Sequence, residues 1–207
     1  MLYSLIDDLK EGLSQKLPGQ DAQYKMVPAG RERTKLEKVT HKNPKRAAVL
    51  VLVYPVDRQP HIVLMKRNSY PGVHSDQISF PGGKLEEFDI NLQKAAVRES
   101  NEELGIQPSL VNILGELTQV YIPPSNFLVN PFVGYSEFRP NFIPDNKEVT
   151  EVLEVSVSDL LDPMSLEVVD VTIKGNQVKV PAYILNGHVV WGATAMMLSE
   201  LSHIIQK

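Results

Sequence analysis

A glycine-rich turn followed by a short acidic helix is the feature that most constrains this chain. Gly82 and Gly83 follow an apolar run that ends at Pro81. Two adjacent glycines let a backbone take positive φ and come close to a ligand. Helical spacing of apolar residues then continues to Gly105, a residue type that often ends helices. The pattern predicts a loop followed by a helix over residues 92–104.

The start of this helix and its core-facing side can also be predicted. Asp89 and Asn91 are both good N-cap residue types, and either one is expected to cap the first turn. Leu92 and Ala96 are expected to face the core, with Val97 as a further candidate.

Three carboxylates gather near the end of the predicted helix. Glu102 and Glu103 lie three and four residues after Glu99, so the three side chains share one helical face. Such like-charge pairs destabilise a helix by about 0.2–0.5 kcal/mol each, and the helix dipole also disfavours anions at this end. A solvated acidic surface is the simplest interpretation of an isolated charge cluster. A divalent cation such as Mg²⁺, which prefers oxygen ligands, would relieve the repulsion among the three carboxylates. The glycine turn upstream, where a ligand can come close to the backbone, favours this cation site over a solvated surface.

This loop and helix resemble the Nudix box, the signature of hydrolases that cleave a diphosphate linked to another moiety. The matching positions are Gly83, Asp89, Arg98, Glu99, Glu102, Glu103, Gly105 and Ile106. Three features depart from the general pattern. Asp89 replaces Glu and is followed by one extra residue before the helix, and Ser100 replaces an aliphatic residue. The spacing of the three glutamates is unaffected.

A second motif immediately upstream resembles the signature of the coenzyme A diphosphatase branch of the family, which also carries the extra residue. The positions that match are Arg67, His74, Gln77, Phe80, Pro81, Gly82 and Gly83, whereas Asn68, Pro71 and Asp76 depart from it. Taken alone, His74 is typical of a surface histidine and Arg67 of a solvated strand end. Beside a diphosphate, a guanidinium can pair with two phosphate oxygens.

The resemblance implies metal-dependent hydrolysis of coenzyme A or acyl-CoA to adenosine 3′,5′-bisphosphate and (acyl-)4′-phosphopantetheine. The expected cofactor is Mg²⁺ or Mn²⁺, held by Glu99, Glu102 and Glu103. Arg98 is expected to orient a glutamate, consistent with its (i, i+4) reach to Glu102. The substrate would be bound by Arg67, His74, Gln77, Gly82 and Gly83.

The general base is expected to be Glu99 or Glu103, and a carboxylate from a later loop remains an alternative. Glu148 and Glu151 are the later candidates, although each is more typical of the polar face of a strand. Two other functions stay open: hydrolysis of another nucleoside diphosphate derivative such as ADP-ribose or NADH, and a non-catalytic Nudix-fold binding module. The intact Arg98 and its neighbouring glutamates argue against the module.

Composition narrows the range of partners. A formal charge of −4 and a pI near 5.8 disfavour nucleic acid, so a small-molecule nucleotide is expected. The absence of cysteine excludes thiolate catalysis and disulfides. The acidic N-terminus does not resemble a signal peptide, and no apolar run approaches the roughly 18 residues of a membrane span. A cytoplasmic protein without membrane contact is expected, and a homodimer is left open.

The remaining patterns predict an α+β or mixed-sheet sandwich, and the resemblance implies the Nudix α/β/α fold. An N-terminal helical extension over 1–45 would pack on a domain over 46–207. Trp191 is expected to be a packing residue, and Lys174 to Gln177 a hairpin turn. Helices are predicted at 3–17 and 194–205, and strands at 47–54, 61–66, 111–117, 119–122, 130–135, 149–157, 168–173 and 178–184.

Overall fold

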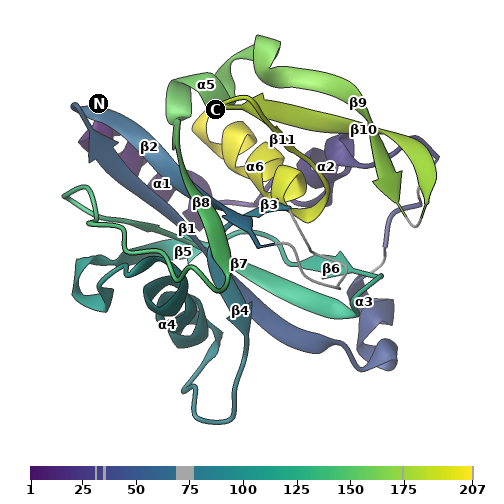
Figure 1. Cartoon of the computed structure of the whole chain (residues 1–207), viewed down its shortest axis with the longest axis horizontal. Coiled ribbons are helices and arrows are strands. Elements are labelled where there is room, and N and C mark those ends of the chain that lie inside the picture. The colour runs from purple at the N-terminus through teal and green to yellow at the C-terminus, as the bar shows by residue number, and fades with distance from the viewer. Residues whose placement is uncertain (31, 35, 69–76, 174, 207) are drawn as a thin grey trace.

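The computed structural model describes residues 1–30, 32–34, 36–68, 77–173 and 175–206 (Figure 1). Its α-helices are α1 (Leu2–Ser14), α2 (Gln20–Gln23), α3 (Leu36–Val39), α4 (Leu92–Leu104), α5 (Val157–Leu161) and α6 (Gly192–Ile205). Its strands are β1 (Lys45–Val56), β2 (Gln59–Arg67), β3 (Ile78–Ser79), β4 (Gly82–Lys84), β5 (Asn112–Glu116), β6 (Val120–Ile122), β7 (Phe127–Tyr135), β8 (Val149–Ser156), β9 (Leu166–Ile173), β10 (Asn176–Leu185) and β11 (His188–Val190). Short 3₁₀ turns lie at Tyr24–Met26, Thr40–Lys42, Pro108–Leu110 and Pro163–Ser165.

Strand β1 is the centre of a mixed sheet that comprises eight strands in the described ranges. It runs parallel to β7, from the pair Lys45 and Phe127 to the pair Val53 and Tyr135. It also pairs antiparallel with β2 and β4. Strand β2 adds β3 and β8 on one side, and β7 adds β5 and β6 on the other.

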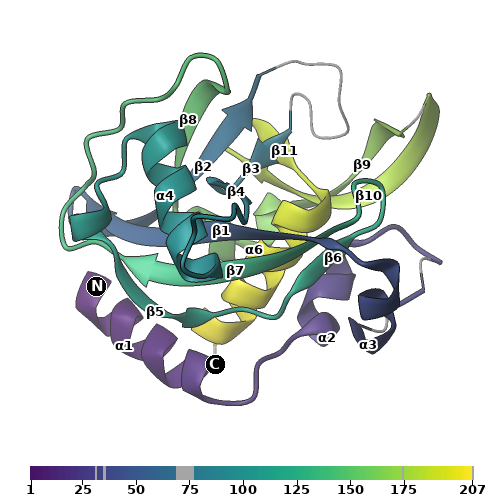
Figure 2. The same cartoon turned by 90° about the horizontal axis from the view of Figure 1, so that it is seen from below.

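The side chains of β1 alternate between two apolar layers, as the period of a strand requires. Ala48, Leu50 and Leu52 belong to the cluster that includes α4. Val51 and Val53 belong to the cluster that includes residues of α1 and α6. Figure 2 shows α4 on one face of the sheet and α1 with α6 on the other. This arrangement confirms the predicted mixed-sheet sandwich with an N-terminal and a C-terminal helix.

The predicted bounds of helix α4 are confirmed. Both ends of the helix are fixed by residues next to them in the sequence. The Asn91 side-chain oxygen accepts a hydrogen bond from the Lys94 amide at 2.9 Å, so Asn91 and not Asp89 is the N-cap. Gly105 adopts φ 69°, the left-handed conformation that closes many helices. Gly105 and Ile106 donate to the carbonyls of Asn101 and Ser100, and the last two carbonyls of the helix, of Glu103 and Leu104, accept from Asp145 and Ile143.

The buried face of α4 differs in part from the prediction. Leu92 and Val97 are only partly buried, whereas Ala95, Ala96 and Ser100 are buried. The helix lies against β1 and β4, so small side chains fill the contact. Leu92, in the first turn, is partly buried and packs against the apolar cluster that contains Ala96, as predicted.

The N-terminal segment packs on the sheet through α1, whose Leu2, Leu5, Ile6 and Leu9 are buried in the larger apolar cluster. The helix ends at Ser14, earlier than the predicted residue 17. Gln15 is extended, with ψ −178°, and Pro18 disfavours a helical conformation at Leu17, so the helix does not continue to residue 17.

A buried carboxylate on α6 ties the N-terminal segment to the sheet. Glu200 is fully buried and accepts hydrogen bonds from the Gly19 amide (3.1 Å) and the Gln23 side chain (2.8 Å). It also accepts bonds from the amide (3.2 Å) and the hydroxyl (2.7 Å) of Thr118. Three distant parts of the chain therefore depend on one buried charge, which is tolerated because its oxygens are well paired.

A second, antiparallel sheet orders β11, β10 and β9, and it confirms the predicted hairpin between β9 and β10. Lys174 of the predicted turn lies outside the described residues. Figure 1 shows this sheet beside α6 and away from α4. No helix in the described part of the chain is both long enough and apolar enough to cross a lipid bilayer.

We predict that Glu200→Ala lowers the free energy of unfolding by about 2–4 kcal/mol, because it leaves several buried donors unpaired. Urea unfolding followed by circular dichroism measures the change. Glu167→Ala, which removes an exposed carboxylate on β9, is the control and should change stability by less than about 0.5 kcal/mol. Equal stability of the two variants would contradict the structural role of Glu200.

Candidate active site

Two glycines bring strand β4 close to helix α4. Gly83 faces Glu99, and a Cβ at position 83 would lie 2.4 Å from the Glu99 side-chain carboxyl carbon. Gly82 has φ 149°, and a Cβ there would lie 2.3 Å from the Ala48 carbonyl oxygen of β1. Any side chain at either position would force the helix, the strand or the carboxylate to move.

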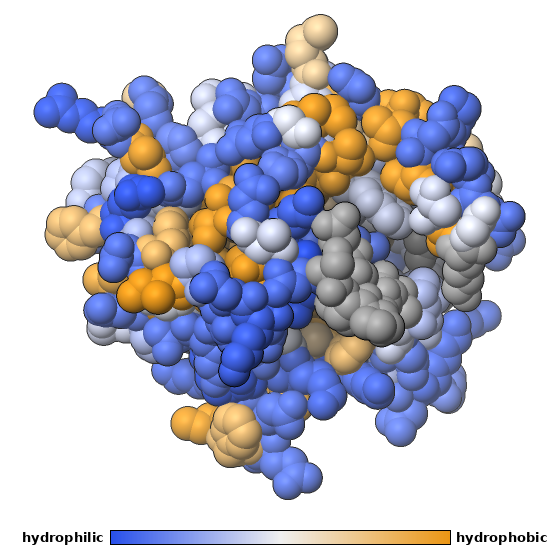
Figure 3. Space-filling view, in the orientation of Figure 1, coloured by the Kyte–Doolittle hydropathy of each residue, from blue (hydrophilic) through white to orange (hydrophobic). Residues whose placement is uncertain are grey.

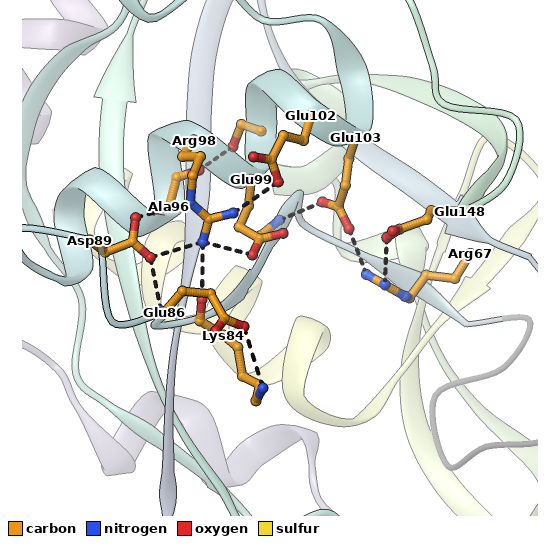
Figure 4. Close-up of polar contacts among 12 residues, drawn as sticks. Arg67, Lys84, Glu86, Asp89, Ala96, Arg98, Glu99, Glu102, Glu103 and Glu148 are labelled. Atoms are coloured by element: carbon orange, nitrogen blue, oxygen red, sulfur yellow. Dashed lines mark hydrogen bonds and ion pairs between the residues drawn. The ribbon is translucent and has the colours of Figure 1, made fainter.

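Glu103 is the buried anchor of the site, with a side chain that is 2% exposed. One carboxylate oxygen accepts a hydrogen bond from Arg67 at 2.9 Å, and the other accepts one from the Gly82 amide at 2.7 Å. Burial raises the pKa of Glu103 to about 7, which Arg67 and the Gly82 amide oppose. Nearby Glu99 and Glu148 raise it further. The carboxylate thus joins α4 to both β2 and β4 (Figure 4).

Arg98 connects the other acidic groups, as Figure 4 shows. Its Nε and Nη2 donate to the two oxygens of Asp89, both at 2.9 Å. Its Nη1 donates to Glu102 at 2.8 Å, the (i, i+4) contact expected from the sequence, and Nη2 lies 3.0 Å from Glu99 Oε1. Phe88 lies beneath the guanidinium, with its ring centroid 5.2 Å from Cζ. Arg98 therefore holds two of the three candidate metal-binding glutamates.

Asp89 has a definite place despite the extra residue that follows it. Its Oδ2 also accepts a hydrogen bond from the Glu86 amide at 2.9 Å, so the loop folds back on itself. The hydrogen bonds from Arg98 hold the pKa of the Asp89 carboxyl below its usual range. The extra residue is accommodated in the loop before α4, and Asp89 still reaches Arg98.

Glu99 and Glu102 differ in their surroundings. Glu99 is largely buried, and burial raises its pKa, with the Arg98 charge opposing the rise. Glu102 and Glu148 add repulsion that raises it further. The Glu102 side chain is 57% exposed. Negative charge is therefore concentrated where α4 faces β4, and it is only partly balanced by Arg98 and Arg67.

The donors of this site fit a hard divalent cation. They are carboxylate oxygens on one helical turn, the ligand type that Mg²⁺ and Mn²⁺ prefer, and a cation would relieve the repulsion that raises the pKa of Glu99. Among the described residues, no three Asp, Glu or His side chains converge as a ready-made cation cage. Glu102 and Glu103 instead pair with Arg98 and Arg67.

The other predicted site residues are placed as follows. Arg67, at the end of β2, also lies 3.6 Å from the half-exposed Glu148. Gln77 lines the same cavity as Arg67 and the two glycines. Glu151 instead faces His188 of β11, at 3.2 Å. His74 and Asp76 lie outside the described residues.

A cavity of about 880 Å³ opens beside the carboxylates. Glu99, Glu103 and Lys84 line one part of it. The cavity continues along residues that the sequence analysis did not connect with the site, which include Phe127, Trp191 and Met197. Trp191, predicted to be a packing residue, is partly exposed on this wall. The only local feature in the sequence that could have pointed to this position is that a single tryptophan precedes the start of a helix.

Comparisons with known proteins agree with this geometry. The family model "NUDIX domain" matches residues 44–172. "Uncharacterized Nudix hydrolase NudL" of Enterobacter sp. (strain 638) is 34% identical over 162 residues, covering 77% of this chain and 82% of the relative. The protein of the same name from Photorhabdus laumondii subsp. laumondii is 30% identical over 164 residues, covering 79% and 87%.

A solved structure of a MutT/nudix family protein from Enterococcus faecalis is similar in fold. Its TM-score is 0.52 at 15% sequence identity, and the match covers 86% of this chain and 71% of that chain. The likeness includes the central sandwich and extends beyond the residues matched by the family model.

We predict that Asp89→Asn lowers the free energy of unfolding by about 1–3 kcal/mol, because it weakens a bidentate pair with Arg98. The pKa of Asp89 is lower in the folded state, so its contribution is present above pH about 3.9 and lost as pH falls through the folded value. Urea unfolding at pH 7 and pH 3 measures both effects. Glu102→Gln, at the exposed side of the same guanidinium, should cost less than about 1 kcal/mol. Equal losses from both variants would contradict this assignment.

We also predict that Gly82→Ala and Gly83→Ala have different consequences. The first places a Cβ against the backbone of β1 at positive φ and should lower the free energy of unfolding by more than 2 kcal/mol. In the second, the three nearest atoms all belong to the movable Glu99 carboxylate, so stability should change by less than about 1 kcal/mol. Thermal and urea unfolding of the two variants test this contrast, which equal destabilisation would refute.

Proposed function

This chain belongs to the NUDIX family, and we propose that the diphosphate bond it hydrolyses is that of coenzyme A or an acyl-CoA. The chain is a Nudix hydrolase, and the members of this family are pyrophosphohydrolases. The proposed products are adenosine 3′,5′-bisphosphate and (acyl-)4′-phosphopantetheine. The site residues, the metal and this substrate are all part of the proposal.

One structural observation supports coenzyme A as the substrate. Described residues of both motifs, the one that resembles the coenzyme A diphosphatase signature and the acidic helix, line a single cavity. Arg67 and Gln77 of the first motif stand at the same cavity as Glu99 and Glu103 of the second. Gly83, which belongs to both motifs, and Gly82 line the same cavity. A diphosphate held there would contact backbone, guanidinium and carboxylates together.

Divalent metal ions are typical of Nudix hydrolases, and Glu99, Glu102 and Glu103 would hold Mg²⁺ or Mn²⁺ here. When bound, the metal neutralises charge on the diphosphate and lowers the pKa of the attacking water. The residues of the chain position the metal ligands and the substrate. Arg98 contacts both Glu99 and Glu102 and so orients two of the proposed ligands. Arg67 lies at the cavity, where it can pair with phosphate oxygens.

Glu99 is the preferred general base within this proposal. It lines the cavity, and its Oε1 lies against Arg98, which holds the carboxylate in a fixed orientation. Glu103 also lines the cavity, but both of its oxygens already accept hydrogen bonds. Glu148 is the third candidate, because it reaches Arg67 from the β8 side of the site.

We predict that the purified protein with Mg²⁺ or Mn²⁺ cleaves coenzyme A and acetyl-CoA faster than ADP-ribose or NADH. Glu102→Gln should lower kcat/KM by at least about 100-fold, since it removes a proposed ligand. Chromatography of the nucleotide products measures both results. The control is Glu87→Gln, an exposed carboxylate of the preceding loop, which should retain full activity.

Three outcomes would contradict parts of the proposal. Preference for ADP-ribose or NADH would show that the upstream motif does not specify the substrate. Full activity of Glu102→Gln would remove that residue from the metal site. Metal-independent or absent turnover of all four compounds, with the protein folded, would favour a binding module.

A further inference from the structure

The cavity continues from the carboxylates into an apolar arm, which we define by Ile122, Phe127, Ile173, Trp191, Ala193 and Met197. These residues come from β6, β7, β9 and the start of α6. Ile173, Trp191, Ala193 and Met197 lie beyond residues 44–172, the part that the family model matches. The arm is therefore built largely by the C-terminal segment of this chain.

The chemistry of the arm differs from that of the rest of the cavity. The charged lining residues Arg67, Lys84, Glu99 and Glu103 lie at its carboxylate end. Two hydroxyls that line the cavity near the arm are already used within the protein, whereas the buried Ser79 hydroxyl at the same cavity has no hydrogen-bond partner in the described part of the chain. The Thr194 hydroxyl donates to the Ile78 carbonyl at 2.9 Å, and the Tyr121 hydroxyl donates to Asn126 at 3.0 Å.

An apolar surface of this kind selects an apolar occupant. Polar groups of a ligand lose their bonds to water on burial, which costs free energy unless the protein replaces those bonds. An adenine ring, a ribose phosphate and the amides of pantetheine all require such partners. An acyl chain requires none, and the flexible thioethers of Met196 and Met197 can adapt to its shape.

The position of the arm also matters, since it opens from the same cavity as the proposed diphosphate site. In Figure 3, hydrophobic residues gather over β9, on the same side of the molecule as the small sheet that contributes Ile173. Leu166 and Val168, toward the other end of that strand from Ile173, are exposed and do not line the cavity.

We propose that the apolar arm binds the acyl chain of the substrate, so that the enzyme prefers medium-chain acyl-CoA to free coenzyme A and acetyl-CoA. This inference rests on the proposed function. It adds a specificity-determining surface formed by Trp191, Ala193, Met197 and Ile173, and assigns it a single chemical class of ligand, an unbranched aliphatic acyl group.

Trp191 allows binding to be measured without catalysis, because it is the only tryptophan of the chain. The metal-free protein in chelator is titrated with coenzyme A, acetyl-CoA and octanoyl-CoA while tryptophan fluorescence is recorded. Each buried methylene contributes about 0.8 kcal/mol, about a fourfold change in affinity at best. Octanoyl-CoA should therefore bind at least about tenfold more tightly than acetyl-CoA and change the Trp191 emission more strongly.

Ala193→Leu fills part of the arm and is the first variant to test. It should weaken octanoyl-CoA binding about tenfold and leave coenzyme A binding unchanged, and kcat/KM with Mg²⁺ should follow the same order. Ala29→Leu, at an exposed position, is its control. If Ala193→Leu does not fold, Ile173→Asp introduces a charge into the arm, and Val168→Asp is its control on the exposed part of the same strand.

The possible results separate the two proposals. Equal binding and equal kcat/KM for the three compounds, with coenzyme A hydrolysed, would overturn the acyl site and leave the proposed function standing. A Trp191 response to adenosine 3′,5′-bisphosphate as large as that to octanoyl-CoA would place the adenosine half in the arm and also overturn it. If the metal-loaded protein hydrolyses none of the three, the proposed function fails, and the acyl site fails with it.

Discussion

The close approach of helix α4 to strand β4 is the constraint on which the site depends. It requires glycine at position 82, where a Cβ would overlap the backbone of β1, whereas a Cβ at position 83 would displace the carboxylate of Glu99. Glu103 stabilises the approach by accepting hydrogen bonds from both the Gly82 amide and Arg67. Two strands and a helix are thus held together by one buried carboxylate.

The close approach of α4 to β4 also brings negatively charged carboxylates together, which by itself destabilises the folded state. Burial and mutual repulsion raise the pKa of Glu99 and of Glu103, whereas Arg98 and Arg67 offset only part of that cost. Conflicts of this kind are common where a site must attract a cation or hold a proton. The arrangement is stabilised elsewhere, by the apolar layers on both faces of β1 and by the fully paired Glu200.

Much of the fold follows from local patterns. The caps of α4, the alternation along β1 and the hairpin between β9 and β10 are local signals, and the predicted elements agree with them. The prediction was less accurate where tertiary packing decides the outcome. Leu92 and Val97 are only partly buried, because the helix lies close enough to the sheet for alanines to fill the interface. The N-terminal helix is also shorter than its apolar spacing suggested.

The sequence by itself determined that one turn of helix carries three glutamates and an arginine behind a double glycine, since spacing along a helix is a local property. Only the tertiary structure decided which partners these charges have. Asp89 reaches Arg98 from across the loop, and Arg67 reaches Glu103 from β2. It also decided that Trp191 lines the cavity beside them, because that wall is assembled from strands and a helix far apart in the chain, whose side chains meet only when the sheet forms.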